Sequence, residues 1–179
     1  MESTQWVFLA GTGTALMPLA LLLPSPALPF AAVLGGLLLA LAWLDLRFGI
    51  VHAGLVLPLL AAGAAAAMLS SPERLGAAAA GAAIGYASFR IIESAFRRLR
   101  GHEGLGRGDA WVLGAVGAWV GPGGLAPLVT VAAALGLLMA LFRSRRVDPR
   151  AEIPFVPALA VASWITWIAI GGAPSWTWP

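Results

Sequence analysis

Long apolar runs, separated by short polar or turn-forming segments, fill nearly all of this 179-residue sequence. A helix needs about 20 apolar residues to cross the ~30 Å hydrocarbon core of a bilayer. Seven runs approach that length, at about 5–23, 27–44, 52–69, 75–92, 106–121, 125–142 and 153–172. The sequence therefore predicts an all-α integral membrane protein with about seven transmembrane helices, forming a single polytopic domain over residues 1–179.

Turn-forming residues separate several of these runs. Pro-Ser-Pro at residues 24–26 divides the first run from the second, and Gly-Pro-Gly-Gly at residues 121–124 divides the fifth from the sixth. If residues 109–142 formed one helix, it would be about 50 Å long, which is too long for a single crossing. We therefore expect two passes joined by a tight turn at Pro122.

The composition supports lipid as the solvent of this chain. Only 11% of its residues are charged, whereas soluble domains carry about 25%, so the charges are too few to cover a water-facing surface. Cysteine is absent, which excludes a thiol nucleophile, a disulfide and a cysteine zinc site. The two histidines, His52 and His102, are too few for an all-histidine metal site. We therefore expect neither a metal nor another cofactor.

The basic residues are all arginines, and ten of the eleven fall on one side of the predicted membrane. They are Arg47, Arg90, Arg97, Arg98, Arg100, Arg107, Arg143, Arg145, Arg146 and Arg150. Positive charge marks the cytoplasmic side, so we expect the N-terminus inside and the C-terminus outside. Because the arginines lie at span ends, orientation in the membrane explains them better than binding to nucleic acid does, and no nucleic-acid partner is expected.

Two acidic residues, Asp45 and Asp109, are the strongest candidates for chemistry. Asp45 directly follows an apolar run and Asp109 directly precedes one, both on the cytoplasmic side, whereas the other acidic residues, Glu93 among them, lie among polar neighbours. Carboxylates in membrane spans are costly and so point to function. Two that meet can share a proton, so that one activates water and the other polarises an amide carbonyl, as in an aspartic protease. A structural ion pair with arginine is the alternative.

The glycines before Asp109 form a second candidate feature. Gly106 and Gly108 leave the backbone uncovered, so an extended substrate can pair there beside the aspartate, in the manner of strand addition. At Gly108 a branched side chain is expected to block this approach and to resist unusual backbone angles. Glycines also simply form loops. Arg107 between them is either an orienting charge or a contact for substrate or lipid phosphate, and His52 is expected to be an interfacial residue rather than a ligand or base.

Three separated segments resemble those of type IV prepilin peptidases. Residues 101–121 resemble the segment around their second aspartate, Asp45-Leu46-Arg47 resembles the first, and residues 153–160 resemble the start of their last span. The resemblance covers roughly residues 27–172. It implies a GxGD-type aspartyl protease bundle in a bacterial cytoplasmic (inner) membrane, with Asp45 and Asp109 catalytic. Such a protease cleaves the leader of type IV prepilins or of secretion pseudopilins at the cytoplasmic membrane face. Trp111 and residues 51–53 depart from the family's usual pattern.

Many members of this family also methylate the new N-terminus, through an added cytoplasmic domain with paired cysteines. This chain has no cysteine and its predicted loops are short, so we expect a short form with peptidase activity and without methyl transfer. Two functions of other kinds are alternatives. Intramembrane acids also occur in proton- or ion-coupled transporters, which usually place them near the bilayer midplane, and the aspartates of a non-enzymatic assembly subunit can bind partner helices.

Overall fold

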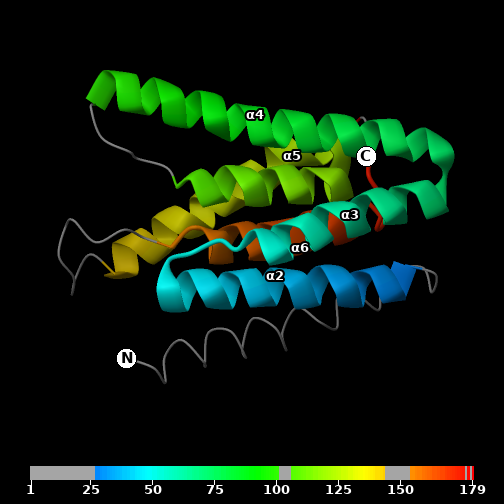
Figure 1. Cartoon of the computed structure of the whole chain (residues 1–179), viewed down its shortest axis with the longest axis horizontal. Helices are drawn as coiled ribbons and strands as arrows, with labels where there is room; N and C mark the ends of the chain where they lie inside the picture. The colour runs from blue at the N-terminus through cyan, green and yellow to red at the C-terminus, as the bar shows by residue number, and fades with distance from the viewer. Residues whose placement is uncertain (1–26, 101–105, 144–153, 176, 178) are drawn as a thin grey trace.

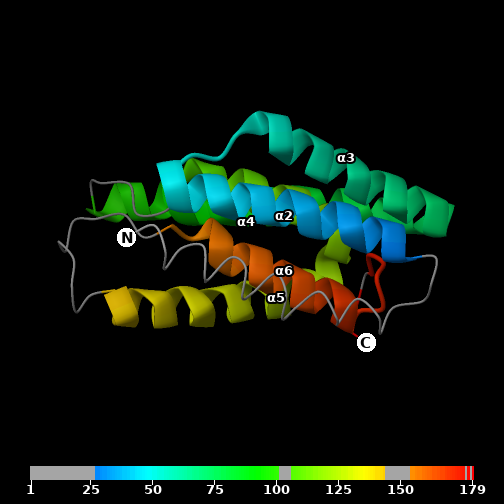
Figure 2. The ribbon, with the colours of Figure 1, turned by 90° about the horizontal axis from the view of Figure 1, so that it is seen from below.

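The computed structural model describes residues 27–100, 106–143, 154–175, 177 and 179. These residues form five helices: α2 (Leu28–Phe48), α3 (Ala53–Ser70), α4 (Pro72–Arg100), α5 (Arg107–Arg143) and α6 (Val156–Ala169). The helices lie roughly side by side along the long axis of the molecule (Figure 1, Figure 2). No strand occurs within the described residues, so the predicted all-α class is confirmed. The predicted first span, 5–23, lies outside them.

Four of the described helices, α2 to α5, are long and apolar enough to cross a membrane, and α6 is shorter at 14 residues. Large apolar side chains such as Met68, Ile91 and Leu137 are exposed on their outer faces, as expected for surfaces that contact lipid. The chain is therefore an all-helical integral membrane protein. The described residues show four helices of spanning length rather than the seven spans that the sequence predicts.

Helix α5 is interrupted at Gly121. This glycine has φ 70° and ψ 180°, outside helical geometry and in a region that residues with a side chain rarely adopt. The chain turns back there, so that both ends of α5 lie at the end of the molecule where α4 finishes (Figure 1, Figure 2). A Cβ atom added to Gly85 of α4 would be 2.7 Å from Leu113 O and 3.3 Å from Leu125 Cδ2. In a straight helix these two residues would be about 18 Å apart, so the predicted interruption beside Pro122 is present.

Small residues bring α4 and the first half of α5 into close contact. A Cβ atom on Gly81 would overlap the carbonyl oxygen of Gly117, and one on Gly117 would overlap the carbonyl oxygen of Gly81. In lipid, where apolar burial does little to drive association, helices pack through such small-residue contacts. On the other side of α5, Gly63 of α3 makes room for the buried indole of Trp119, whose Nε1 donates to Leu59 O at 2.8 Å.

Two helices end at other residues than the apolar runs that predict them. The fourth run was expected at 75–92, but α4 continues to Arg100, and its 29 residues make a helix about 43 Å long. Arginine is a good helix former, so the helix goes on where the apolar run stops. The last run was expected at 153–172, but α6 ends at Ala169, close to Gly171 and Gly172, which have φ values of 77° and 81°. Glycines with positive φ commonly terminate helices.

Candidate active site

Asp45 lies in the last turn of α2. The helix ends three residues later, and Gly49, in the left-handed conformation with φ 64°, donates its N–H to Asp45 O at 2.9 Å, which is a common helix C-cap. The side chain is only 9% exposed. Its Oδ2 accepts a hydrogen bond from the backbone N–H of Val156 at 3.1 Å. This donor is the first N–H of α6, which has no acceptor within its own helix, so α6 fixes the position of the Asp45 carboxylate.

Asp109 lies in the first turn of α5 and is also 9% exposed. Its backbone N–H donates to Gly106 O at 3.1 Å, which closes the turn at the start of the helix. Its Oδ2 points back toward Gly106, because a Cβ atom added to that glycine would be 3.2 Å away from it. A carboxylate in the first turn also interacts favourably with the helix dipole. The motif thus places this acidic group at a helix end, where its carboxylate faces the glycine at position 106.

The fold brings the two predicted aspartates together. The C-terminal end of α2 and the N-terminal end of α5 lie at the same end of the molecule (Figure 1), and the two carboxyl groups are close enough to interact electrostatically. Both are largely shielded from solvent, although they are 64 positions apart in the sequence. The result is a pair of acidic groups in one region shielded from solvent, and acid–base chemistry with a shared proton requires two such groups.

The two candidate glycines have different surroundings. Gly106 is exposed beside the Asp109 carboxylate, whereas Gly108 is partly buried in the first turn of α5. A Cβ atom on Gly108 would be 2.5 Å from Val51 Cγ2 and 2.7 Å from Val51 Cβ. Neither glycine has a positive φ, so the expectation of unusual backbone angles at Gly108 is wrong. The contact with Val51 explains why this position has no side chain.

His52 and Trp111, both in segments that depart from the family pattern, have structural contacts. His52 is exposed, and its Nδ1 accepts a hydrogen bond from the Gly54 N–H at 3.0 Å, which caps the start of α3. Trp111 is 52% exposed, and its ring lies against that of Tyr86, with centroids 4.7 Å apart. Within the described residues, no group of three or more His, Cys, Asp or Glu side chains is placed to hold a metal ion.

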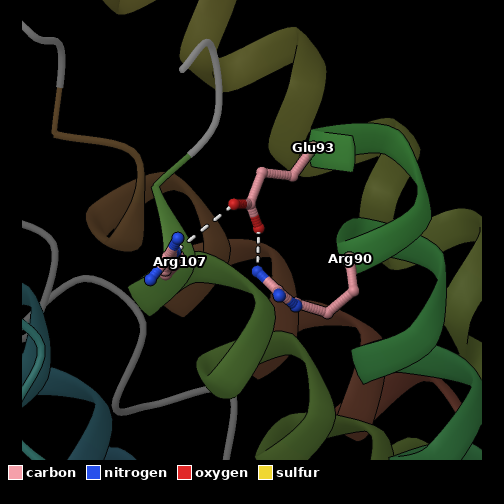
Figure 3. Close-up of polar contacts among 3 residues, drawn as sticks. All are labelled: Arg90, Glu93 and Arg107. Carbon is pink, nitrogen blue, oxygen red and sulfur yellow. Dashed lines mark hydrogen bonds and ion pairs between the residues drawn. The ribbon is translucent and has the colours of Figure 1, made fainter. Parts of the chain in front are cut away.

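Glu93 is the acidic residue whose placement the sequence did not reveal. It is 1% exposed on α4, its Oε2 forms an ion pair with Arg90 Nη1, and its Oε1 lies 3.5 Å from Arg107 Nε (Figure 3). Arg107 is therefore more than an orienting charge, because it links the start of α5 to a buried carboxylate on α4. The one available signal was the spacing of Arg90 and Glu93, which places them on one helix face.

Comparison with known proteins identifies the family to which this site belongs. The sequence profile of the type IV leader peptidase family matches residues 32–141. Proteins named prepilin leader peptidase/N-methyltransferase are similar: that of Xanthomonas campestris is 36% identical over 138 residues, and that of Burkholderia pseudomallei is 39% identical over 154. The alignments cover 75% and 85% of this chain but 48% and 50% of those relatives, so the chain spans about half their length. The comparison with solved structures gave no match.

Both aspartates lie inside the matched region, at the ends of the helices that bring them together. The family match covers residues 32–141, and the relatives align with most of the chain. This chain therefore belongs to the type IV leader peptidase family.

Proposed function

We propose that this chain is an aspartic endopeptidase that cleaves the leader peptide of type IV prepilins or of related pseudopilins, with Asp45 and Asp109 as its catalytic pair. The observation that carries the proposal is the meeting of two shielded carboxyl groups from different helices, in a chain of the leader peptidase family. The relatives named above are prepilin leader peptidases, which gives the substrate class.

In the proposed reaction, one carboxyl group is ionised and the other is protonated. The ionised group takes a proton from a water molecule as the water oxygen attacks the carbonyl carbon of the scissile peptide bond. The protonated group donates a hydrogen bond to the carbonyl oxygen, on which negative charge develops. The tetrahedral intermediate then collapses, the C–N bond breaks, and a carboxyl group transfers a proton to the leaving amine. Only Asp45, Asp109 and water take part.

The substrate is proposed to approach at Gly106. This glycine is exposed and lies next to Asp109 Oδ2, so a peptide can come close to the carboxylate there. Gly108 is the weaker candidate for a direct contact, because Val51 lies against it. The hydrophobic helix that follows the leader of a prepilin would lie in the lipid bilayer alongside the exposed apolar faces of the bundle.

We propose seven membrane crossings, with the aspartate pair at the cytoplasmic face of a bacterial inner membrane, the N-terminus inside and the C-terminus outside. The interruption of α5 at Gly121 supports two crossings by that segment. The ten-to-one distribution of the arginines supports the orientation. The C-terminal ends of α2 and α4, which carry arginines of the larger group, lie at the same end of the molecule as the start of α5 (Figure 1).

We also propose that these 179 residues cleave without methylating the product, because they contain no cysteine for the paired-cysteine domain expected of methylating members. Incubation of the protein with substrate and a labelled methyl donor checks this. The expected product has a free N-terminal amine, and transfer of label to the cleaved product would contradict the proposal.

Cleavage by the purified protein tests the peptidase directly. Mass spectrometry of a prepilin after incubation should show a single cut between the leader and the hydrophobic helix. Asp45→Asn and Asp109→Asn should each lower the rate by about 100- to 10,000-fold, the usual contribution of a positioned acid or base. Both variants should fold, because asparagine keeps the size of aspartate and its oxygen can still accept a hydrogen bond.

Glu73→Gln on α4 is the control for loss of one negative charge, because Glu73 is exposed in the first turn of that helix, far along the chain from the site. It should cleave at the wild-type rate. Normal turnover by a folded Asp45→Asn or Asp109→Asn protein would refute the catalytic pair. Ion flux into liposomes without any cleavage of prepilins would favour a transporter instead.

A further inference from the structure

A third buried carboxylate, Glu93, lies outside the aspartate pair. It is 1% exposed and sits on the part of α4 that runs alongside the start of α5. Burial of an ionised carboxylate is unfavourable unless cations compensate it. Cations must therefore lie beside Glu93, and its polar stretch of sequence does not show which ones they are.

Two arginines from different helices contact the two oxygens of Glu93. Arg90, three residues earlier on α4, forms an ion pair with Oε2, and Arg107 Nε, from α5, lies 3.5 Å from Oε1 (Figure 3). Oε1 has no hydrogen bond within the described residues. Arg90 alone can balance the charge of the carboxylate, so charge balance does not require Arg107. The second contact instead links α4 to the first residue of α5.

This link acts on the turn that contains Asp109. Arg107, Gly108 and Asp109 are consecutive, and each makes a different contact: Arg107 with Glu93 of α4, Gly108 with Val51 in the α2–α3 connection, and Asp109 with Gly106 through its backbone. The first turn of α5 therefore has neighbours both on α4 and in the α2–α3 connection. If the contact with Glu93 is lost, the turn keeps Val51 as a neighbour but loses its ion pair with α4.

We propose that Glu93 is a positioning residue, which holds the start of α5 through Arg107 so that the Asp109 carboxyl group faces Asp45. The inference rests on the proposed catalytic pair. A displacement of about 1 Å in a reacting group can lower a rate by about 100-fold, so a weak ion pair at this place has a large effect on turnover. It has little effect on substrate binding, because Glu93 itself is inaccessible.

The test compares three single neutralising variants of the full-length protein and one double variant. Glu93→Gln and Arg107→Gln should each lower kcat by about 10- to 100-fold and change KM by less than about twofold. The double variant should be no slower than the slower single variant, because both remove the same contact. Arg90→Gln is the matched control: it removes the other partner of Glu93 but leaves Oε1 and Arg107 in place, and it should retain kcat.

Hydrogen exchange supplies a readout that does not need cleavage. In protein reconstituted into lipid nanodiscs, Glu93→Gln and Arg107→Gln should raise amide exchange in residues 106–112 relative to the wild type, while Arg90→Gln should not. If Glu93→Gln does not fold, Arg107→Gln decides the question, since the Arg107 side chain is 63% exposed and its loss leaves no buried gap.

Each possible outcome supports or overturns the proposal. Equal losses of kcat in Arg90→Gln and Glu93→Gln would show that the carboxylate only needs neutralisation and would overturn it. Unchanged exchange in residues 106–112 of both Glu93→Gln and Arg107→Gln would also overturn it. If the wild-type protein cleaved no prepilin, the proposed function would fail, and the exchange data would still decide whether Glu93 holds the start of α5.

Discussion

Gly108 has no room for a side chain, because a Cβ atom there would be 2.5 Å from Val51 Cγ2. Gly108→Ala should therefore impair cleavage by displacing the turn that contains Asp109, and overpacking of this kind typically costs about 1–3 kcal/mol of stability. Gly108→Val should be worse, and should reduce activity more than expression. The measurements are the cleavage rate and the amount of folded protein recovered from the membrane.

A second substitution separates packing from substrate contact at this position. Val51→Gly removes both of the atoms nearest to the added Cβ, so Gly108→Ala combined with Val51→Gly should recover most of the activity lost by Gly108→Ala. Val51→Gly alone provides the baseline. The double variant could instead be as inactive as Gly108→Ala, while Val51→Gly alone cleaves normally. In that case the added methyl group would clash with the substrate and not with Val51.

The sequence predicted Asp45 and Asp109 because acidic residues that abut apolar runs are rare enough to stand out. It did not predict the contact of Val156 with Asp45 or the burial of Glu93. Glu93 lies in a stretch with several arginines, and local composition indicates an exposed position. Its burial results from α5 packing against α4, and a long-range contact of this kind leaves no local pattern in one sequence.

At the scale of the elements, the interruption of α5 depends on Gly121. Its φ of 70° is unfavourable for a residue with a side chain, and a Cβ atom there would be 2.7 Å from Ser175 N. Gly121→Ala should therefore lower stability by about 1–3 kcal/mol from the backbone conformation alone. Thermal unfolding in detergent measures this as a lower Tm.

Gly36 offers a matched control in α2, where an added Cβ atom would meet nothing within 4 Å. Gly36→Ala should leave Tm unchanged or raise it slightly, because alanine favours a helix over glycine by about 0.5–1 kcal/mol. Equal Tm values for Gly121→Ala and Gly36→Ala would mean that the turn tolerates a side chain.

Helix positions were more predictable than helix ends. The apolar run at 27–44 corresponds to α2, and the glycine-proline turn signal corresponds to the interruption of α5. The end of α4 was not predictable from hydropathy, because hydropathy measures where lipid contact stops and not where the backbone ceases to be helical. Arg97 and Arg98 extend the helix beyond the apolar run without altering its hydrogen-bonding pattern.

At the scale of the whole molecule, the arrangement in the membrane is testable because the chain has no native cysteine. Glu73 and Arg98 are exposed near opposite ends of α4. A membrane-impermeant maleimide added to intact cells should label Glu73→Cys but not Arg98→Cys, and in inverted vesicles the pattern should reverse. The physical reason is the concentration of arginines on one side of the bundle. Labelling of Arg98→Cys from outside intact cells would refute the proposed orientation.

The hydrogen bond from Val156 to Asp45 also has a consequence for biosynthesis. A ribosome makes Asp45 first, Asp109 later and Val156 last of the three, and the membrane receives the helices in that order. The Asp45 carboxylate obtains its donor from α6 only when that helix has inserted. From the synthesis of Asp109 until that of Val156, the growing chain therefore has both acidic groups but lacks the donor that anchors Asp45. We expect proteolytic competence to appear only once the last described helix has inserted.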